Sequence, residues 1–347
     1  MHKGEVSLKN SEFFFYSNRY RLLIIVAVAV VLFLIILFSL FTGTIKFSFQ
    51  DILEIFGKNS SESMAKQILV NIRLPRILTG LFVGMNLSVA GVLLQGVLRN
   101  PMASPNIIGV NSGAGLAAVI IMTIFPGNVS LIPPASFIGA LAASMLIYLL
   151  SYSTQNSRTV YVILAGIAVS NLLNALTSAL MSLNSDTLEI TYSWLLGSLS
   201  ARGWTAFNSI WPYSLIALTV SIFISPKINL FGLGEEVASS VGLSTRFYRT
   251  IILLTSSILA GSAVSAAGTI GFVGLIAPHC ARIIVGNDHR FLVPLSALIG
   301  AALLILSDTV ARTLFQPVEI SVGIITSLLG APFFIFLLYR KRKEEKI

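Results

Sequence analysis

Charged side chains at spacings that could support chemistry are scarce in this sequence. Asp308 and Arg312 lie four residues apart, a spacing that brings two side chains together on one face of a helix. The favoured interpretation is an ion pair near a helix end. The alternative is a proton-coupling acid within an apolar segment, with Glu319 as a second acid. Acids are almost absent from the interiors of the apolar segments, which disfavours proton coupling.

Motifs for catalysis and for nucleotide binding are absent from the sequence. It has no G-x-x-x-x-G-K-[ST], so no P-loop binds ATP, and it has neither H-E-x-x-H nor G-x-S-x-G. The three histidines His2, His279 and His289 lack metal-ligand spacing. We therefore expect a protein that is not an enzyme, with no catalytic residue, no bound metal and no cofactor of its own.

Polar residues inside apolar segments indicate either helix contacts or a pathway. Asn171, Asn174 and Ser178 fall at i, i+3 and i+7, on one helical face. Amides are costly against lipid, so this face meets either protein or water. Asn100 opens a second polar stretch with two prolines, and residues 268–279 hold three glycines and a proline. Irregular backbone in a membrane is buried in protein or lines a cavity, so these stretches predict a pathway.

The segment 232–249 concentrates charge between two long apolar runs. Glu235 and Glu236 suit the first turn of a short helix, where the backbone dipole favours anions, and Gly242 would end it. Three apolar residues would form a small patch: Val237, Ala238 and Val241. The segment is either a solvated connector or a small amphipathic helix that docks into a partner's groove.

The composition is that of an integral membrane protein. Of 347 residues, 55% are hydrophobic and 11% are charged, and the mean hydropathy is +0.87. Apolar runs of about 20 residues are long enough to cross roughly 30 Å of hydrocarbon as helices. We therefore expect an all-α fold in the lipid bilayer. The net charge of +9 fits basic cytoplasmic loops better than nucleic-acid binding.

Charges and turn residues divide the chain into ten expected transmembrane helices. Their approximate bounds are 22–41, 77–97, 111–125, 135–152, 159–182, 206–225, 250–268, 271–285, 291–307 and 321–339. The transmembrane domain is placed at 22–340, between an N-terminal segment 1–21 and a basic tail 341–347. An even number of spans puts both termini on one side. With the termini inside, 16 basic residues lie inside and 7 outside, which predicts cytoplasmic termini and a cytoplasmic loop at 226–249.

Two halves of the chain echo each other. Arg73-x-x-Arg76 precedes the second span and Arg246-x-x-Arg249 the seventh, and each span is followed by a stretch broken by glycine and proline. These two spans run in opposite directions. The pattern is compatible with an inverted repeat of spans 2–5 and 7–10, and equally with chance similarity between apolar sequences.

The sequence resembles the permease subunits of ABC importers for iron-siderophores, haem and vitamin B12, the FecCD type, from about residue 20 to the end. The matching motifs are Arg73-Leu74-Pro75-Arg76, residues 100–105 and 109–114, residues 268–279 with Arg282, Asp308 to Arg312, and Gly330-Ala331-Pro332. The resemblance implies a BtuC-like fold in the cell membrane. It also implies an ATPase dimer that uses ATP and Mg²⁺, an extracytoplasmic substrate-binding protein and a second permease, identical or related.

The resemblance also implies roles for particular residues. The loop between spans six and seven contacts the ATPase in the family, and Glu236, Ala238 and Gly242 match its Glu-Ala-Ala-x3-Gly pattern, whereas Val237 replaces the first alanine. Arg73, Arg76 and Arg312 match arginines that receive acids of the binding protein, and we expect them to be exposed. The fifth helix lines the family's pathway. The implied function is ATP-driven import of an iron-siderophore or related chelate; the alternative is a proton- or ion-coupled secondary transporter that uses Asp308.

Overall fold

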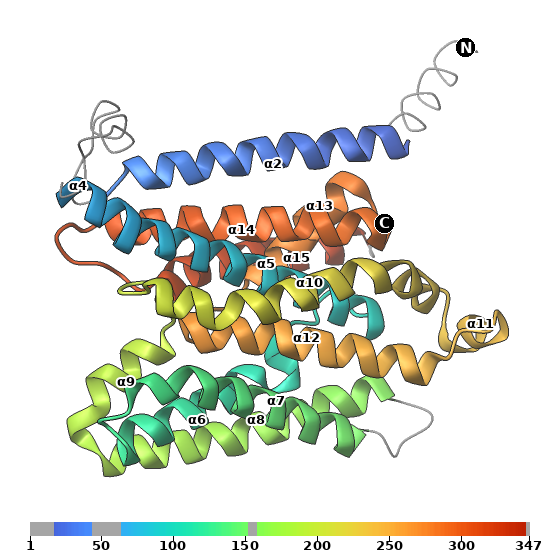
Figure 1. The fold of residues 1–347 in the computed structure, drawn as a ribbon. Helices are drawn as coiled ribbons and strands as arrows, with labels where there is room; N and C mark the ends of the chain where they lie inside the picture. The colour runs from blue at the N-terminus through green and yellow to red at the C-terminus, as the bar shows by residue number, and fades with distance from the viewer. Residues whose placement is uncertain (1–16, 44–63, 152–157, 345–347) are drawn as a thin grey trace.

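A computed structural model describes residues 17–43, 64–151 and 158–344, and this part of the chain forms helices and no strands. Figure 1 shows the helices as a bundle whose long axes run roughly in parallel across the view. The first half comprises α2 Asn18–Phe41, α4 Met64–Gln67, a π-helical turn Ile68–Arg73, α5 Leu74–Val97, α6 Val110–Ile124, α7 Ile132–Ser151, α8 Arg158–Leu183 and α9 Leu188–Leu195. The second half comprises α10 Trp204–Gly232, α11 Glu235–Ser240, α12 Thr245–Ala267, α13 Val273–Val285, α14 His289–Thr313 and α15 Val322–Glu344.

Each of the ten expected spans overlaps a helix. Seven helical segments are long and apolar enough to cross a membrane, and α6, α13 and residues 322–337 of α15 are shorter apolar helices. The number of crossings and the cytoplasmic termini stay predictions. Within the expected N-terminal segment and the basic tail, residues 1–16 and 345–347 lie outside the described residues.

Several helices extend beyond the predicted spans. The sixth span was placed at 206–225, but α10 continues through Pro226 to Gly232, and α12 already begins at Thr245. A proline removes only its own N–H from the hydrogen-bond ladder, so a helix supported by its neighbours can continue through it. The expected loop 226–249 is therefore largely helical. At the C-terminus, α15 extends beyond residue 340 into the predicted tail.

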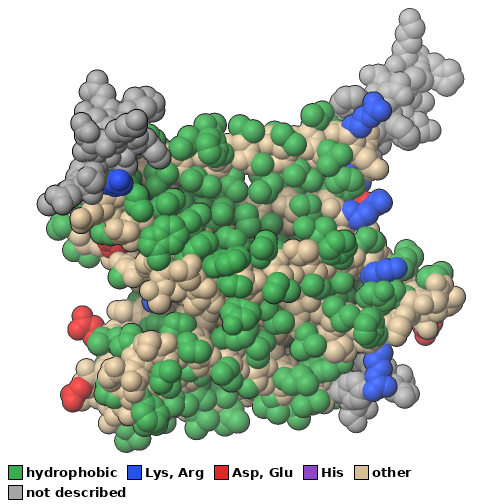
Figure 2. Space-filling model, in the orientation of Figure 1, with side chains coloured by type: hydrophobic (Ala, Val, Ile, Leu, Met, Phe, Trp, Pro, Cys, Tyr) green, Lys and Arg blue, Asp and Glu red, His purple; other side chains and the backbone are tan. Residues whose placement is uncertain are grey.

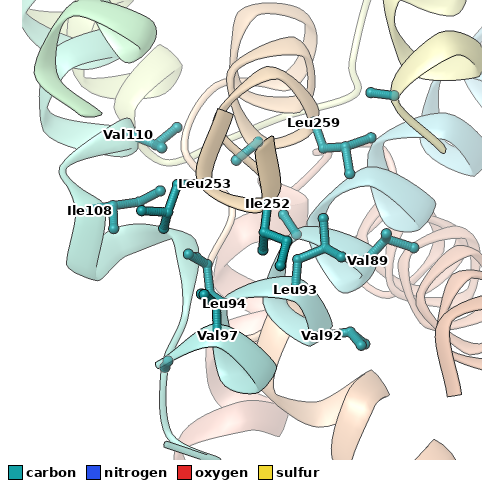
Figure 3. Close-up of a cluster of buried hydrophobic side chains, with 14 of the residues drawn as sticks. Val89, Val92, Leu93, Leu94, Val97, Ile108, Val110, Ile252, Leu253 and Leu259 are labelled. Carbon is teal, nitrogen blue, oxygen red and sulfur yellow. The ribbon is translucent and has the colours of Figure 1, made fainter. Parts of the chain in front are cut away.

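Helices α5 and α12 form the centre of the bundle, and most of their residues are buried. Figure 3 shows their side chains interleaved, with Leu93 of α5 beside Ile252 of α12. Close approach extends to α14, because a Cβ on Gly84 would lie 2.4 Å from the carbonyl oxygen of Gly300. Only glycine permits backbones to meet at this distance, which is how small residues promote helix packing in membranes.

The packing partners of α5 and α12 correspond to each other. α5 packs against α14 and α13, whereas α12 packs against α7 and α6, and α5 and α12 also pack against each other. In Figure 1, α5 runs from the left end of the bundle to the right and α12 runs back from right to left. This exchange of equivalent neighbours between antiparallel helices is the arrangement expected for an inverted repeat.

The two ends of the bundle differ in charge. Figure 2 shows a wide apolar band across the visible face, with basic side chains along its right-hand edge and acidic ones prominent at its left-hand edge. Helix α11 lies at the right-hand end, where α2 begins (Figure 1). A basic end on one side of an apolar band is the distribution that the positive-inside rule describes for the cytoplasmic side.

Candidate functional site

Helix α11 projects from the right-hand end of the bundle, between α10 and α12 (Figure 1). Glu235 and Glu236 lie in its first turn, as predicted. Val237 and Val241 are 47% and 62% exposed, so they give the projection an apolar outer surface. The expectation that Ala238 belongs to this patch is wrong, because its side chain is fully buried against the bundle.

Backbone geometry and one ion pair hold α11 in place. Gly242 follows the helix with a φ of 84°, a left-handed conformation that favours glycine, and its N–H donates to the carbonyl of Ser239 at 2.9 Å. Glu235 forms a salt bridge with Arg249 in the second turn of α12. The projection is thus connected to α12, so a movement of α11 would be passed to this central helix.

At the opposite end, Arg76 of α5 connects three segments. It donates to both oxygens of Asp308 on α14, at 2.9 Å each, and to Glu319 after α14, at 3.0 and 3.3 Å. Ser200 also donates to Glu319, at 2.9 Å. Burial of the Glu319 carboxyl opposes its charge, but Arg76 and Ser200 together lower its pKa below the ordinary value.

Arg73 and Arg312 hold the end of α2. Arg73 donates to the carbonyl oxygens of Leu40 at 2.5 Å and Phe41 at 3.4 Å, and Arg312 donates to the carbonyl and hydroxyl of Ser39. The last carbonyls of a helix lack partners within the helix and carry partial negative charge. The two guanidinium groups therefore cap a helix that is otherwise peripheral.

These contacts correct two expectations. The three arginines are not exposed cations, since Arg73, Arg76 and Arg312 are only 5%, 8% and 5% exposed. The ion pair expected between Asp308 and Arg312 is also wrong, because Asp308 pairs with Arg76 from another helix. Asp308 lies five residues before the end of α14 at Thr313, near a helix end as expected. The role of the three arginines in docking stays a prediction.

A half-polar pocket of about 430 Å³ lies against α8. Asn174 and Ser178 line it, together with residues from the first broken stretch, α6, α9 and the second broken stretch. These additional residues include Asn106, Asn111, Ser112 and Thr269. Asn171 is exposed on the same helix but does not line the pocket, and Asn100 lies away from it, where its side chain accepts from the N–H of Met102 at 2.9 Å.

The hydroxyl groups of this pocket are mostly engaged by backbone. Ser112 donates to Gly109 at 3.1 Å, Thr177 donates to Leu173 at 2.8 Å, and Thr269 donates to Leu195. Their oxygen lone pairs remain as acceptors, while the asparagine amides supply donors. None of the lining residues is charged. The pocket can therefore form hydrogen bonds with a ligand but cannot neutralise a strongly charged one.

Gln95 is a structural residue that the sequence reasoning missed. Its amide donates to Gly274 at 3.2 Å and to Ala103 at 3.4 Å, and its oxygen accepts from Arg282 at 2.9 Å. It thus connects the irregular stretch after α5 to the first turn of α13. A lone glutamine inside the apolar run 77–97 was the available signal, because such a residue is buried only with partners.

No group of three or more potential metal ligands (His, Cys, Asp or Glu) occurs among the described residues. The site therefore consists of an apolar projection at one end, a half-polar pocket in the middle, and an arginine–carboxylate network at the other end. These parts can bind partners and admit a ligand.

Comparison with known proteins gives one consistent result. Residues 30–340 match the model of the FecCD transport family. The chain is 41% identical over 274 residues to the cobalamin import system permease protein BtuC of Halobacterium salinarum, covering 79% of this chain and 74% of that one. It is 37% identical to the iron(3+)-hydroxamate import system permease protein FhuG of Bacillus subtilis, covering 92% and 97%.

A solved structure shows a similar fold. It is described as an inward-facing conformation of a metal-chelate type ABC transporter, and it is 31% identical to this chain with a TM-score of 0.83. The match covers 91% of this chain and 99% of that one.

Proposed function

Because the chain belongs to the FecCD transport family, we propose that it is the permease subunit of an ATP-driven importer in the cytoplasmic membrane. The proposed cargo is an iron-siderophore complex or a related haem or cobalamin chelate. The observation that carries the proposal is the match over residues 30–340, since it includes every element of the site. The permease makes no covalent bond with its cargo, and a separate ATPase hydrolyses ATP with Mg²⁺.

Helix α11 is the proposed contact for the ATPase dimer. Its two exposed valines form a compact apolar surface at the basic end of the bundle, where the positive-inside rule places the cytoplasm. A short helix with such a surface suits a groove on a partner. The salt bridge from Glu235 to Arg249 supports transmission of motion to α12.

The pocket against α8 is the proposed part of the translocation pathway. Its lining is uncharged and rich in amides and hydroxyls, so a chelate could pass with weak hydrogen bonds and without strong retention. The outer side of α8, including Asn171, is exposed in the single chain, which leaves room for a second permease subunit, identical or related. The cavity between the two subunits would then open alternately to either side.

The opposite end is the proposed site for the extracytoplasmic binding protein. Arg73, Arg76 and Arg312 gather there, although each is engaged within the chain. An acidic partner would therefore have to compete with Asp308, Glu319 or the end of α2 for them. Coupling through Asp308 in a secondary transporter is disfavoured by its buried pairing with Arg76.

The test is uptake by the assembled complex in proteoliposomes. ATP inside the vesicles should drive accumulation of a labelled ferric chelate added with its binding protein, and a proton ionophore should leave the initial rate unchanged. Uptake that needs an ion gradient and no ATPase would contradict the proposal.

The α11 contact has a separate test. Changing Val237 and Val241 to aspartate should prevent co-purification of the ATPase, whereas Ser239→Asp, which places one charge at another exposed position of α11, should retain it. Equal retention by both variants would show that the ATPase binds elsewhere.

A further inference from the structure

A second groove lies between α7 and α12 and has no part in the proposed transport path. Its volume is about 420 Å³, within the range of small-molecule sites. Leu253, Ser257 and Ser144 are buried at its floor, while Ile138, Met145 and Leu254 are exposed along it. Ser144 and Ser257 donate their hydroxyl protons to backbone carbonyls of their own helices, at 2.9 Å each. The groove therefore presents an almost wholly apolar surface.

The length and direction of the groove match one leaflet of a membrane. It runs from Ile138 to Tyr148 on α7 and from Ile258 to Thr250 on α12. Ten residues of α-helix span about 15 Å, half of the roughly 30 Å hydrocarbon core. The Thr250 end lies toward the start of α12 and therefore toward α11, at the right-hand end in Figure 1. The groove thus spans the leaflet that we assign to the cytoplasmic side.

A polar chain closes the groove at this end and leads to a cation. The hydroxyls of Tyr148 and Thr250 lie 2.6 Å apart, and Thr250 donates to the backbone carbonyl of Arg246 at 3.0 Å. Arg246 is exposed one helical turn beyond Thr250, on the same side of α12. Arg246 therefore lies at the end of the groove where the headgroup of a lipid would lie if its acyl chain occupied the groove.

We propose that the α7–α12 groove binds one acyl chain of an anionic glycerophospholipid from the cytoplasmic leaflet, with Arg246 at the phosphate. The apolar lining accounts for the chain, and the charge of Arg246 accounts for a preference for anionic headgroups. Because α12 also carries Arg249, the partner of Glu235 on α11, this lipid would contact the helix that links the proposed ATPase contact to the core.

The test is native mass spectrometry of the full-length chain, delipidated in detergent and titrated with palmitoyl-oleoyl phosphatidylglycerol or phosphatidylcholine. The anionic lipid should bind about fivefold more tightly, the factor that one basic residue near a membrane surface supplies. Arg246→Gln should reduce binding of phosphatidylglycerol to the level of phosphatidylcholine. Arg19→Gln removes the same charge from an exposed position at the start of α2 and should leave both lipids unaffected.

The acyl chain has its own variants. Ala142→Leu should fill the groove and weaken both lipids alike, whereas Ala29→Leu, on an exposed face of α2, should not. Met145→Ser, at an exposed position in the groove, removes apolar contact without adding bulk and should also weaken both lipids. Equal binding of the two lipids by the unaltered chain, or equal effects of Arg246→Gln and Arg19→Gln, would overturn the headgroup assignment. If both groove variants bind lipid normally, the groove holds a protein segment or nothing, and the proposal fails.

Discussion

Replacing Arg76 by methionine tests the account of the arginine–carboxylate network. The substitution keeps much of the apolar stem but removes the bonds to Asp308 and Glu319. Asp308 is 3% exposed, so it would become an unpaired buried charge. Removing one partner of a buried pair costs about 3–5 kcal/mol. At about 2 °C per kcal/mol for a large domain, Tm should fall by roughly 6–10 °C.

A double substitution separates the loss of pairing from the loss of packing. Arg76→Met combined with Asp308→Leu removes both buried charges, and apolar replacement of a buried pair is often neutral. The double variant should therefore be more stable than Arg76→Met alone, and Glu319, whose side chain is 32% exposed, can be solvated. The assay is thermal unfolding in detergent, followed by the fluorescence of the three tryptophans.

An ion pair in which only the arginine is exposed is the control. Arg290→Gln removes a guanidinium group whose side chain is 55% exposed, and Asp288 keeps Arg21 and Asn229 as partners, so Tm should fall much less than in Arg76→Met. If the double variant loses as much stability as Arg76→Met or more, the network acts through shape, and charge compensation by Arg76 is refuted.

Two further predictions concern the same bundle. The pKa of Glu319 is lowered from its ordinary value of 4.5, so its ion pair contributes fully to stability when the pH is above 4.5. This contribution is lost as the pH falls through the lowered pKa of the folded state. The Tm difference between the unaltered chain and Glu319→Gln should therefore be constant near neutrality and shrink below about pH 4.5; a constant difference down to pH 3 would contradict the assignment. Gly84→Val should lower stability by about 1–3 kcal/mol because its side chain meets the Gly300 carbonyl, whereas Gly232→Ala, with open space around it, should not. Equal unfolding temperatures for these two variants would show that α5 and α14 separate easily.

The helices were largely predictable from the sequence, because hydrophobic runs of sufficient length have few alternatives in a bilayer. Their ends were not. A proline at 226 and a charge at 308 are local signals of a helix end, but each lies inside a long helix here. Neighbouring helices supply the contacts that allow these helices to continue. The local pattern of hydrophobic residues carries no information about those neighbours.

The candidate site was predictable where its chemistry is local. The acids at the start of α11 and the glycine after it follow from short-range rules for helix ends. The partner of Asp308 was not predictable in this way, because Arg76 lies 232 residues away, whereas Arg312 is only one helical turn away. The i,i+4 spacing permits a contact between Asp308 and Arg312. Which contact forms in the folded protein depends on which buried charge needs a partner.

The enclosure of α5 has a consequence for biogenesis. Its polar side chains find partners that are synthesised much later: Asn86 donates to Ser214, 128 residues on, and Arg76 pairs with Asp308, 232 residues on. Until those helices arrive, α5 must reside in the membrane with this arginine and this asparagine unsatisfied, or remain beside a chaperone or the insertion machinery. Contacts of such sequence separation form late. Truncation before α14 should therefore leave α5 as the element most exposed to degradation.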